Sequence, residues 1–163
     1  MLSAGRPRPG RGARALLPLA APIVTAWAAW QRARAMRRGR PLTARQRRIA
    51  AAVGVAHPED IRLLLVDRVP IPGGRWIDAL ARRLGLPGPD VDGLTLGHAI
   101  LVRHCALSEE LLAHECRHVQ QCEAAGSMAR FLRAYLGQVA RHGYRQAPFE
   151  VDARDAARPH RRA

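Results

Sequence analysis

Three residues with metal-binding and proton-transfer side chains lie close together in this sequence: His114, Glu115 and His118. They form the pattern H-E-x-x-H, with the two histidines four positions apart. On a helix, residues four apart lie one above the other, so both imidazoles can reach the same metal ion. Glu115 is rotated by about 100° from His114 and can lie beside the metal without binding it. There its carboxylate can accept a proton from a water molecule that zinc activates, so the pattern predicts a hydrolytic zinc site.

A third protein ligand must come from elsewhere in the chain, because catalytic zinc usually has three protein ligands and one position for water. Glu150 is the main candidate, since Pro148 favours the first turn of a helix and places this acid near its start. Asp152 and Asp155 follow on the same helix and compete for the role. Three imidazoles are further alternatives: His98, expected as a hydrogen-bonded core residue on a strand; His104, expected in a loop; and His142.

Local signals predict the helices that must position these side chains. Ser108 is typical of the residue before a helix, acids follow it in the first turn, and Gly126 is a helix stop. A further helix is expected between Ser127 and Gly143, and a last one over about 148–157. Nearer the amino terminus, a capping box at 43–46 opens a helix that should run to Val53.

Two stretches predict buried strands. Residues 61–66 form an apolar run bounded by turn residues, and apolar side chains alternate over residues 94–103, which favours a single second strand. A short helix is expected between them, over 75–84. The order of elements predicts an α+β fold that is mostly helical, with a small sheet.

The chain of 163 residues is long enough for one domain with a hydrophobic core. Its basic residues are unevenly placed: residues 1–48 carry 12 of the 27 arginines and none of the 13 acids. We therefore expect a basic extension over residues 1–40, disordered at 1–14, ahead of a nearly neutral domain over 41–157. Residues 158–163 are expected to be a disordered tail.

The extension contains an apolar run over residues 15–30 that ends in Trp27 and Trp30. Three interpretations remain open: a helical or targeting extension, attachment to a membrane surface through residues 15–40, or a cleaved signal. A cytoplasmic location is favoured, with membrane association and secretion as the alternatives. Aromatic residues make up only 4% of the chain, which argues against nucleic-acid binding through stacking.

The residues around the two histidines resemble the zincin metallopeptidases of the Glu type. The resemblance rests on residues 111–121, on Gly143-Tyr144 and on residues 147–153, Ala-Pro-Phe-Glu-Val-Asp-Ala, and it spans about residues 42–157. It is closer to small uncharacterised bacterial domains described as zinc metallopeptidases. It implies a zincin-like fold in which His114, His118 and Glu150 bind zinc and Glu115 is the general base.

The same resemblance implies further roles. The strand over 94–103 would lie beside the active-site helix and could pair with an extended peptide. Tyr144 could donate a hydrogen bond to the oxyanion that forms during hydrolysis, with a packed structural tyrosine as the alternative. The sequence departs from the family at Ala147, where an Asn is frequent, and at Arg117, which is expected to point toward solvent or toward a substrate carboxylate.

The function predicted from the sequence is zinc-dependent hydrolysis of peptide bonds in a peptide or protein substrate. Glu115 would take a proton from the water and pass it to the leaving amine. The alternative is a catalytically idle zinc domain that acts as a membrane- or partner-interaction module.

Overall fold

The computed structural model describes residues 11–70 and 91–161, with the side chains of the first helix described from residue 22 onward. Within these ranges there are five α-helices: α1 (Arg11–Arg38), α2 (Ala44–Ala52), α4 (Glu109–Ala124), α5 (Met128–His142) and α6 (Pro148–Ala157). Four strands accompany them: β1 (Arg40–Pro41), β2 (Arg62–Val66), β3 (Gly93–Leu96) and β4 (Ala99–Arg103). The predicted α+β class is confirmed. The helix expected over 75–84 lies outside the described residues.

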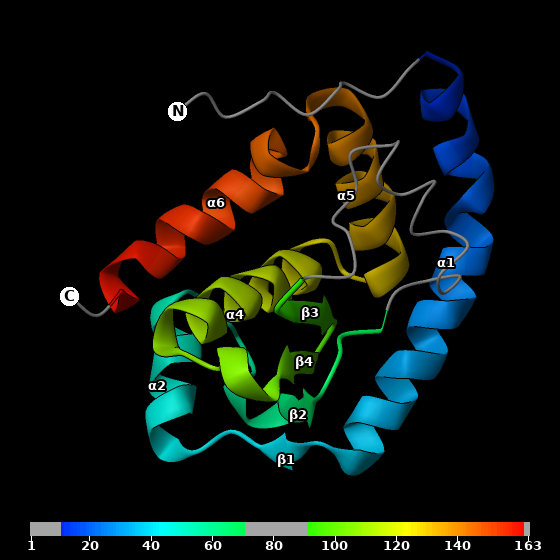
Figure 1. Ribbon diagram of the computed structural model, residues 1–163. Coiled ribbons are helices and arrows are strands. Elements are labelled where there is room, and N and C mark those ends of the chain that lie inside the picture. The colour runs from blue at the N-terminus through cyan, green and yellow to red at the C-terminus, as the bar shows by residue number, and fades with distance from the viewer. Residues whose placement is uncertain (1–10, 71–90, 162–163) are drawn as a thin grey trace.

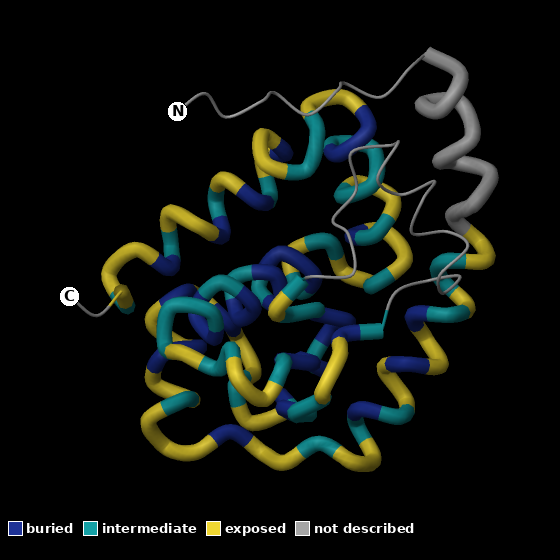
Figure 2. Tube along the Cα trace, viewed as in Figure 1, coloured by how far each residue is buried: buried dark blue, intermediate teal, exposed yellow. Residues whose placement is uncertain are grey.

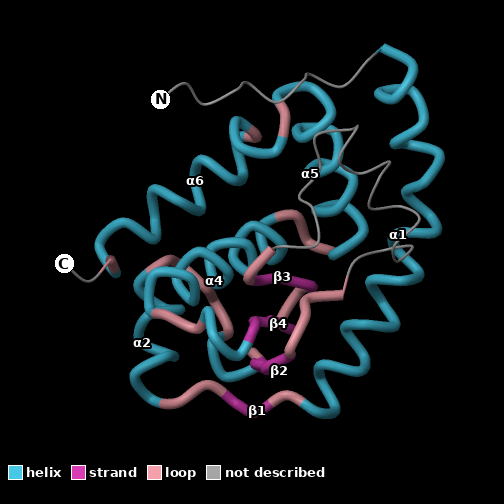
Figure 3. Tube along the Cα trace, viewed as in Figure 1, coloured by secondary structure: helices cyan, strands magenta, loops and turns pink. Residues whose placement is uncertain are grey.

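The strands form one small mixed sheet in the order β1-β2-β4-β3. The central strands β2 and β4 are parallel, with Leu63 opposite Ile100, and the two outer strands pair antiparallel with them. Helices surround this sheet, as Figure 3 shows. Helix α4 lies on one face between β3 and α6, while α1 covers the opposite face (Figure 1). The sheet is therefore placed directly beside the helix that carries the two histidines, as the sequence predicts.

Residues 94–103 form a hairpin, where the sequence predicts one strand. The chain turns at Gly97 and His98, and Gly97 has a φ of 64°, a conformation that favours glycine. The turn reverses the side-chain alternation, so Leu94 and Leu96 pack on the α1 side of the sheet while Ile100 and Val102 pack on the α4 side. The sequence reads as one continuous strand because the two-residue turn keeps Leu94, Leu96, Ile100 and Val102 at even spacing, and because β4 is apolar on both faces.

Both faces of the sheet are covered by hydrophobic clusters. The larger cluster joins the sheet to α2 and α4, and includes Leu63, Ile100, Leu112 and Val119. The smaller cluster joins the other face to α1 and to the start of α5. Buried residues are concentrated in the strands and in α4 (Figure 2). Burial of α4 between two layers gives the histidine-bearing helix a rigid setting.

The predicted helix ends agree with the structure. Thr43 and Gln46 form the capping box at the start of α2, and the Ser108 and Ser127 side chains cap α4 and α5 by accepting hydrogen bonds from backbone N–H groups. Gly126, with a φ of 74°, follows the end of α4. These caps satisfy N–H groups that a helix leaves without an internal partner.

Residues 11–14 and 158–161 are more structured than the sequence predicts, and residues 1–10 and 162–163 lie outside the described residues. Helix α1 begins at Arg11, within the segment expected to be disordered, and its second half contributes the fully buried Ala28 and Ala35 to the core. At the other end, Arg158–His160 form a short 3₁₀ turn, and Arg161 makes an ion pair with Glu110. None of the helices in the described ranges is long and apolar enough to cross a membrane.

Candidate metal centre

Helix α4 brings the two histidines together on one face. The caps at Ser108 and Gly126 fix the length of the helix, and apolar residues on its other side pack against the sheet. His114 and His118 are one turn apart and point the same way, so their Nε2 atoms are 3.2 Å apart. The sequence-based prediction that the two imidazoles share a face is confirmed.

Helix α6 brings Glu150 to the same point. Ala147 is fully buried and Pro148 begins the helix, so the first turn of α6 lies against α4. The Glu150 carboxylate is only 2% exposed, with Oε2 3.5 Å from His114 Nε2 and Oε1 3.3 Å from His118 Nε2. The three side chains thus form a group, all of whose ligand atoms lie within 4.8 Å of one another, that could hold a metal ion.

The separations within this group are close to those between the ligand atoms of a metal site. With bonds of 2.0–2.1 Å to nitrogen and oxygen, neighbouring ligand atoms of a tetrahedron are about 3.3 Å apart. The two Nε2 atoms are 3.2 Å apart, and they lie near different oxygens of the Glu150 carboxylate: His114 Nε2 is 3.5 Å from Oε2, and His118 Nε2 is 3.3 Å from Oε1. Two imidazoles and one carboxylate are also a donor set that zinc and other first-row divalent metals accept. Geometry and chemistry therefore agree on a site for a divalent cation.

The electrostatics of the group favour positive charge. Burial acts to raise the pKa of Glu150, but hydrogen bonds from His114 and His118, with a further one from Tyr135, hold it well below its usual range. For His118, burial acts to lower the pKa, yet the hydrogen bond to Glu150 and the carboxylate of Glu115 raise it overall. Glu150 is therefore ionised, and a cation placed among these side chains is stabilised by a buried negative charge.

Glu115 lies on the side of α4 that faces β3. The carboxylate is 4% exposed, and Thr95 Oγ1 lies 2.7 Å from its Oε2 and 3.0 Å from its main-chain oxygen. A Cβ added to Gly93 would be 2.4 Å from Glu115 Oε1, so the carboxylate occupies space that only a glycine leaves free. The edge strand of the sheet therefore fixes the position of this acid.

Tyr144 lies in the short 3₁₀ turn Tyr144–Gln146 that leads into α6. Burial raises the pKa of its hydroxyl, and the carboxylates of Glu150 and Glu115 raise it further. The structure thus brings Tyr144 close to both acids of the site. Its phenol stays protonated and can donate a hydrogen bond.

Tyr135 on α5 is a site residue that sequence reasoning missed. Its hydroxyl donates a 2.7 Å hydrogen bond to Glu150 Oε1. From the sequence it belongs to the apolar face of α5, together with Phe131 and Val139, and these two residues are indeed buried. A tyrosine within such a face needs a hydrogen-bond partner, which is the signal that could have linked it to a buried acid.

The alternative acids do not join the group. Asp152 accepts hydrogen bonds of 2.7 and 3.0 Å from Arg117, which hold the pKa of Asp152 below its usual range. Asp155 makes an exposed ion pair with Arg158. Arg117 therefore points neither to open solvent nor to a substrate position, but to α6 and, through Nη1, to the carbonyl oxygen of Val53.

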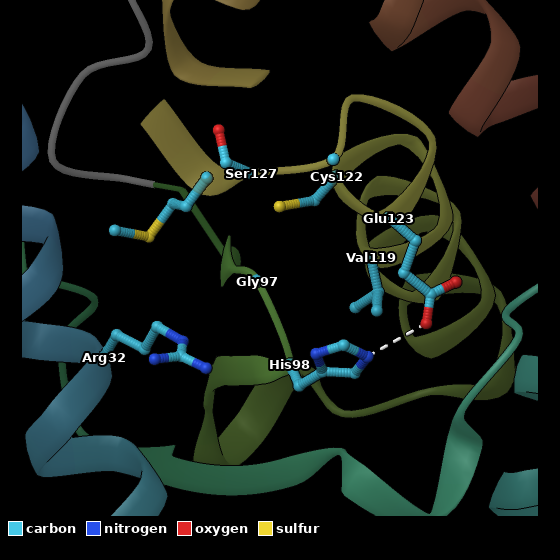
Figure 4. Close-up of a pocket in the computed structure, with 9 residues that line it drawn as sticks. Arg32, Gly97, His98, Val119, Cys122, Glu123 and Ser127 are labelled. Carbon is cyan, nitrogen blue, oxygen red and sulfur yellow. Dashed lines mark hydrogen bonds and ion pairs between the residues drawn. The ribbon is translucent and has the colours of Figure 1, made fainter. Parts of the chain in front are cut away.

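The alternative histidines also lie elsewhere. His98 occupies the β3–β4 turn, where its Nε2 is 2.9 Å from Glu123 Oε1. Figure 4 shows this pair in a separate pocket of about 350 Å³ that Arg32 and Cys122 also line. His104 begins a 3₁₀ turn (His104–Ala106), and His142 is exposed at the end of α5. The turn at Gly97 moves His98 out of the core position that the sequence predicts.

Comparison with protein-family models, with curated proteins and with solved structures finds no match to this chain. What the chain does must therefore be argued from the geometry and chemistry of the group on α4 and α6.

Proposed function

We propose that this protein is a zinc-dependent metallopeptidase with a zincin-like site. The observation that carries the proposal is the buried group of His114, His118 and Glu150, whose ligand atoms all lie within 4.8 Å of one another and could hold a metal ion. A second acid, Glu115, lies on the same helix and is held by the neighbouring strand. A metal group with an adjacent buried carboxylate is the minimum that metal-assisted hydrolysis requires.

Each residue of the site has its own role in the proposed hydrolysis. Zinc held by the two histidines and Glu150 supplies a Lewis acid that polarises a carbonyl and makes water more acidic. Glu115 accepts the proton of the attacking water and delivers it to the leaving amine. Thr95 keeps the Glu115 carboxylate in place through its hydroxyl group. Tyr144, protonated because its pKa is raised, donates a hydrogen bond to the developing oxyanion.

An extended peptide is the substrate that the surroundings of the site favour. Strand β3 is at one end of the sheet, and none of the described strands pairs with its outer edge. The Glu115 carboxylate contacts Gly93 and Thr95 of this same strand. A peptide that adds to the edge of β3 would run past the acid that handles the proton, held by main-chain hydrogen bonds.

The alternative is a zinc domain without catalysis. Structural zinc sites usually have four protein ligands, whereas catalytic sites have three. In the described part of the chain, the buried group has three members, which favours catalysis. Zinc held by a protein that cleaves no peptide, even from a mixed library, would favour the idle domain.

The substitution Glu115→Gln tests the proposal. We expect peptide hydrolysis to fall by about 100-fold or more, because a general base is lost, while zinc content stays at that of the parent chain. Glu110→Gln is the matched control, since it makes the same change on the same helix at a residue paired only with exposed Arg161. Full activity in Glu115→Gln would rule out this acid as the base. Full zinc content in both His118→Ala and Glu150→Ala would rule out the metal site.

A further inference from the structure

We propose that Gln121 is a positioning residue for the metal ligand His118, and that Arg117 and Asp152 hold Gln121 in the one orientation that serves this role. The proposal rests on the proposed function, since it concerns the same metal site. Gln121 lies on α4, one turn beyond His118, and is buried, with 6% of its surface exposed. Its side chain lies between His118 and α6.

The hydrogen bonds of Gln121 determine which way its amide group faces. Its Nε2 lies 3.0 Å from the carbonyl oxygen of Phe149 and 2.7 Å from Asp152 Oδ2. Both of these partners can only accept hydrogen bonds, so they require the amide nitrogen with its two hydrogens. The amide oxygen must therefore face the opposite way, toward His118, where Oε1 lies 2.8 Å from Nδ1.

This orientation fixes the tautomer of His118. Because the amide oxygen cannot donate, the hydrogen between the two groups belongs to Nδ1 of the imidazole. The neutral ring then carries its lone pair on Nε2, which is the atom that faces His114 and Glu150. Gln121 thus orients His118 so that Nε2 is available to bind a metal. Hydrogen bonds of this kind orient metal-binding histidines in general.

The same hydrogen bonds join ligand orientation to the docking of α6. Phe149 and Asp152, which fix the amide of Gln121, lie on either side of the ligand Glu150 on α6. Asp152 is fixed in turn by two hydrogen bonds from Arg117, whose Nη1 donates to the carbonyl oxygen of Val53 at the end of α2. The contacts that orient the ligand His118 therefore also hold α6, the helix that carries the ligand Glu150, against α4.

An amide next to the imidazole differs from the carboxylate that often occupies this place. Gln121 accepts the hydrogen bond without adding a charge beside His118 Nδ1. The charged carboxylate of Asp152 contacts the other end of the Gln121 amide. Gln121 therefore orients the ring from the Nδ1 side through an uncharged partner, while the carboxylate of Glu150 lies on the Nε2 side. This arrangement suits a ligand that must offer a free lone pair to a metal.

The substitution Gln121→Met tests the proposal, because methionine has a similar length and makes no such hydrogen bonds. We expect zinc affinity, measured by chelator competition, to fall by about 10- to 100-fold. In the zinc-loaded parent, the His118 Nδ1–H proton should be visible by NMR and exchange slowly with water, and this signal should be lost in the variant. Gln120→Met is the matched control, on the neighbouring position, and should keep both properties.

A second pair of variants covers the case in which Gln121→Met fails to fold. Asp152→Ala removes the acceptor that orients the amide, from a side chain that is 42% exposed, and should lower zinc affinity in the same direction by a smaller factor. Asp155→Ala, on the same helix, is its control. If His118→Ala and Glu150→Ala lose zinc while Gln121→Met and Asp152→Ala match their controls, the positioning role is wrong and the metal site stands. If all of these variants keep parental affinity, the metal site itself is wrong.

Discussion

At the scale of single residues, the position of the proposed base Glu115 depends on residue 93 being a glycine, which has no side chain. Gly93 leaves the space that the Glu115 carboxylate fills, and the Thr95 hydroxyl then fixes one of its oxygens. Neither neighbour can do chemistry on its own. Their effect is to hold the acid at one place beside the metal group, and positioning of this kind accounts for a large share of catalytic rate.

Gly93→Ala should therefore separate catalysis from metal binding. The added Cβ would come within 2.4 Å of Glu115 Oε1, so the carboxylate must move. A displacement of about 1 Å costs about 100-fold in rate, and we expect hydrolysis to fall by this factor while zinc content is unchanged. Gly137→Ala is the control, because the nearest atoms to its Cβ are at 3.5 Å or beyond. Equal activity in the two variants would contradict the placement of Glu115.

The two tyrosines of the site should respond differently to loss of their hydroxyl groups. Tyr135→Phe removes the hydrogen bond to Glu150 Oε1, so zinc affinity should fall by about 10-fold. Tyr144→Phe should lower kcat, because its proposed partner is the oxyanion, and should lower zinc affinity by less than Tyr135→Phe. Chelator competition and steady-state kinetics on both variants check this. If Tyr144→Phe lost zinc affinity and kept its kcat, Tyr144 would support the ligand Glu150 and would not stabilise the oxyanion.

The residues of the site differ in how far the sequence could predict them. His114, Glu115 and His118 follow from spacing within one helix, and Glu150 from a helix start that Pro148 marks. Tyr135, Thr95 and Gln121 could not be found in this way. Each of these three acts through a contact between side chains whose meeting depends on how separate elements pack.

At the scale of elements, α1 combines a buried and an exposed face with different chemistry. Ala28 and Ala35 are fully buried against the sheet. On the opposite side, Ile23 and Trp30 are 75% and 61% exposed. Arg34 and Arg37 fall on the same side as this pair at about 100° per residue. Apolar side chains aligned with arginines are typical of helices that lie on an anionic membrane surface.

We propose that this exposed face of α1 contacts anionic membranes. The chain should sediment with vesicles that contain phosphatidylglycerol and not with vesicles of phosphatidylcholine alone, and added salt should weaken the binding. Trp30→Ser should reduce binding by several fold, since the free energy of binding weakens by about 25 cal/mol for each Å² of apolar surface that the membrane no longer buries. Ala26→Ser, on the same side of the helix, is the control. Equal binding to neutral and anionic vesicles would contradict the role of the arginines.

The hairpin is the element that the sequence could not predict. Leu94, Leu96, Ile100 and Val102 alternate as if they shared one face, yet the turn at Gly97 sends the two pairs to opposite faces. A two-residue turn preserves the even spacing of apolar residues, and β4 is apolar on both faces, so alternation alone does not reveal the reversal. The caps of α2, α4 and α5 were predictable because they depend on residues three positions apart.

At the scale of the whole molecule, the metal group joins two layers. Its ligands come from α4, which lies against the sheet, and from α6, which packs on the outer side of α4. A bound ion should therefore hold α6 in place, beyond what the Arg117–Asp152 pair and the buried Ala153 and Ala157 contribute. Binding that is confined to the folded state adds directly to its stability.

Removal of the metal should consequently lower the free energy of unfolding. At free zinc 100 times the dissociation constant, the ion adds about 2.7 kcal/mol to the free energy of unfolding, which corresponds to roughly 5–11 °C in Tm. We expect a chelator to lower Tm by this amount, and hydrogen exchange to rise first over 147–157. Glu150→Ala should show no such response to zinc. An identical response in that variant would mean that the stabilising ion binds elsewhere.

The position of α1 has a practical consequence for work on a shortened chain. The sequence suggests that residues 1–40 can be removed as an appendage, but Ala28 and Ala35 cover Leu96 and Leu101 of the hairpin. Deletion up to Pro41 would leave those leucines facing water, on the face of the hairpin opposite to the one that contacts Glu115. A truncation that starts upstream of Trp27 keeps that covering, and it is the version to purify when the metal group is to be studied without the first arginines of the chain.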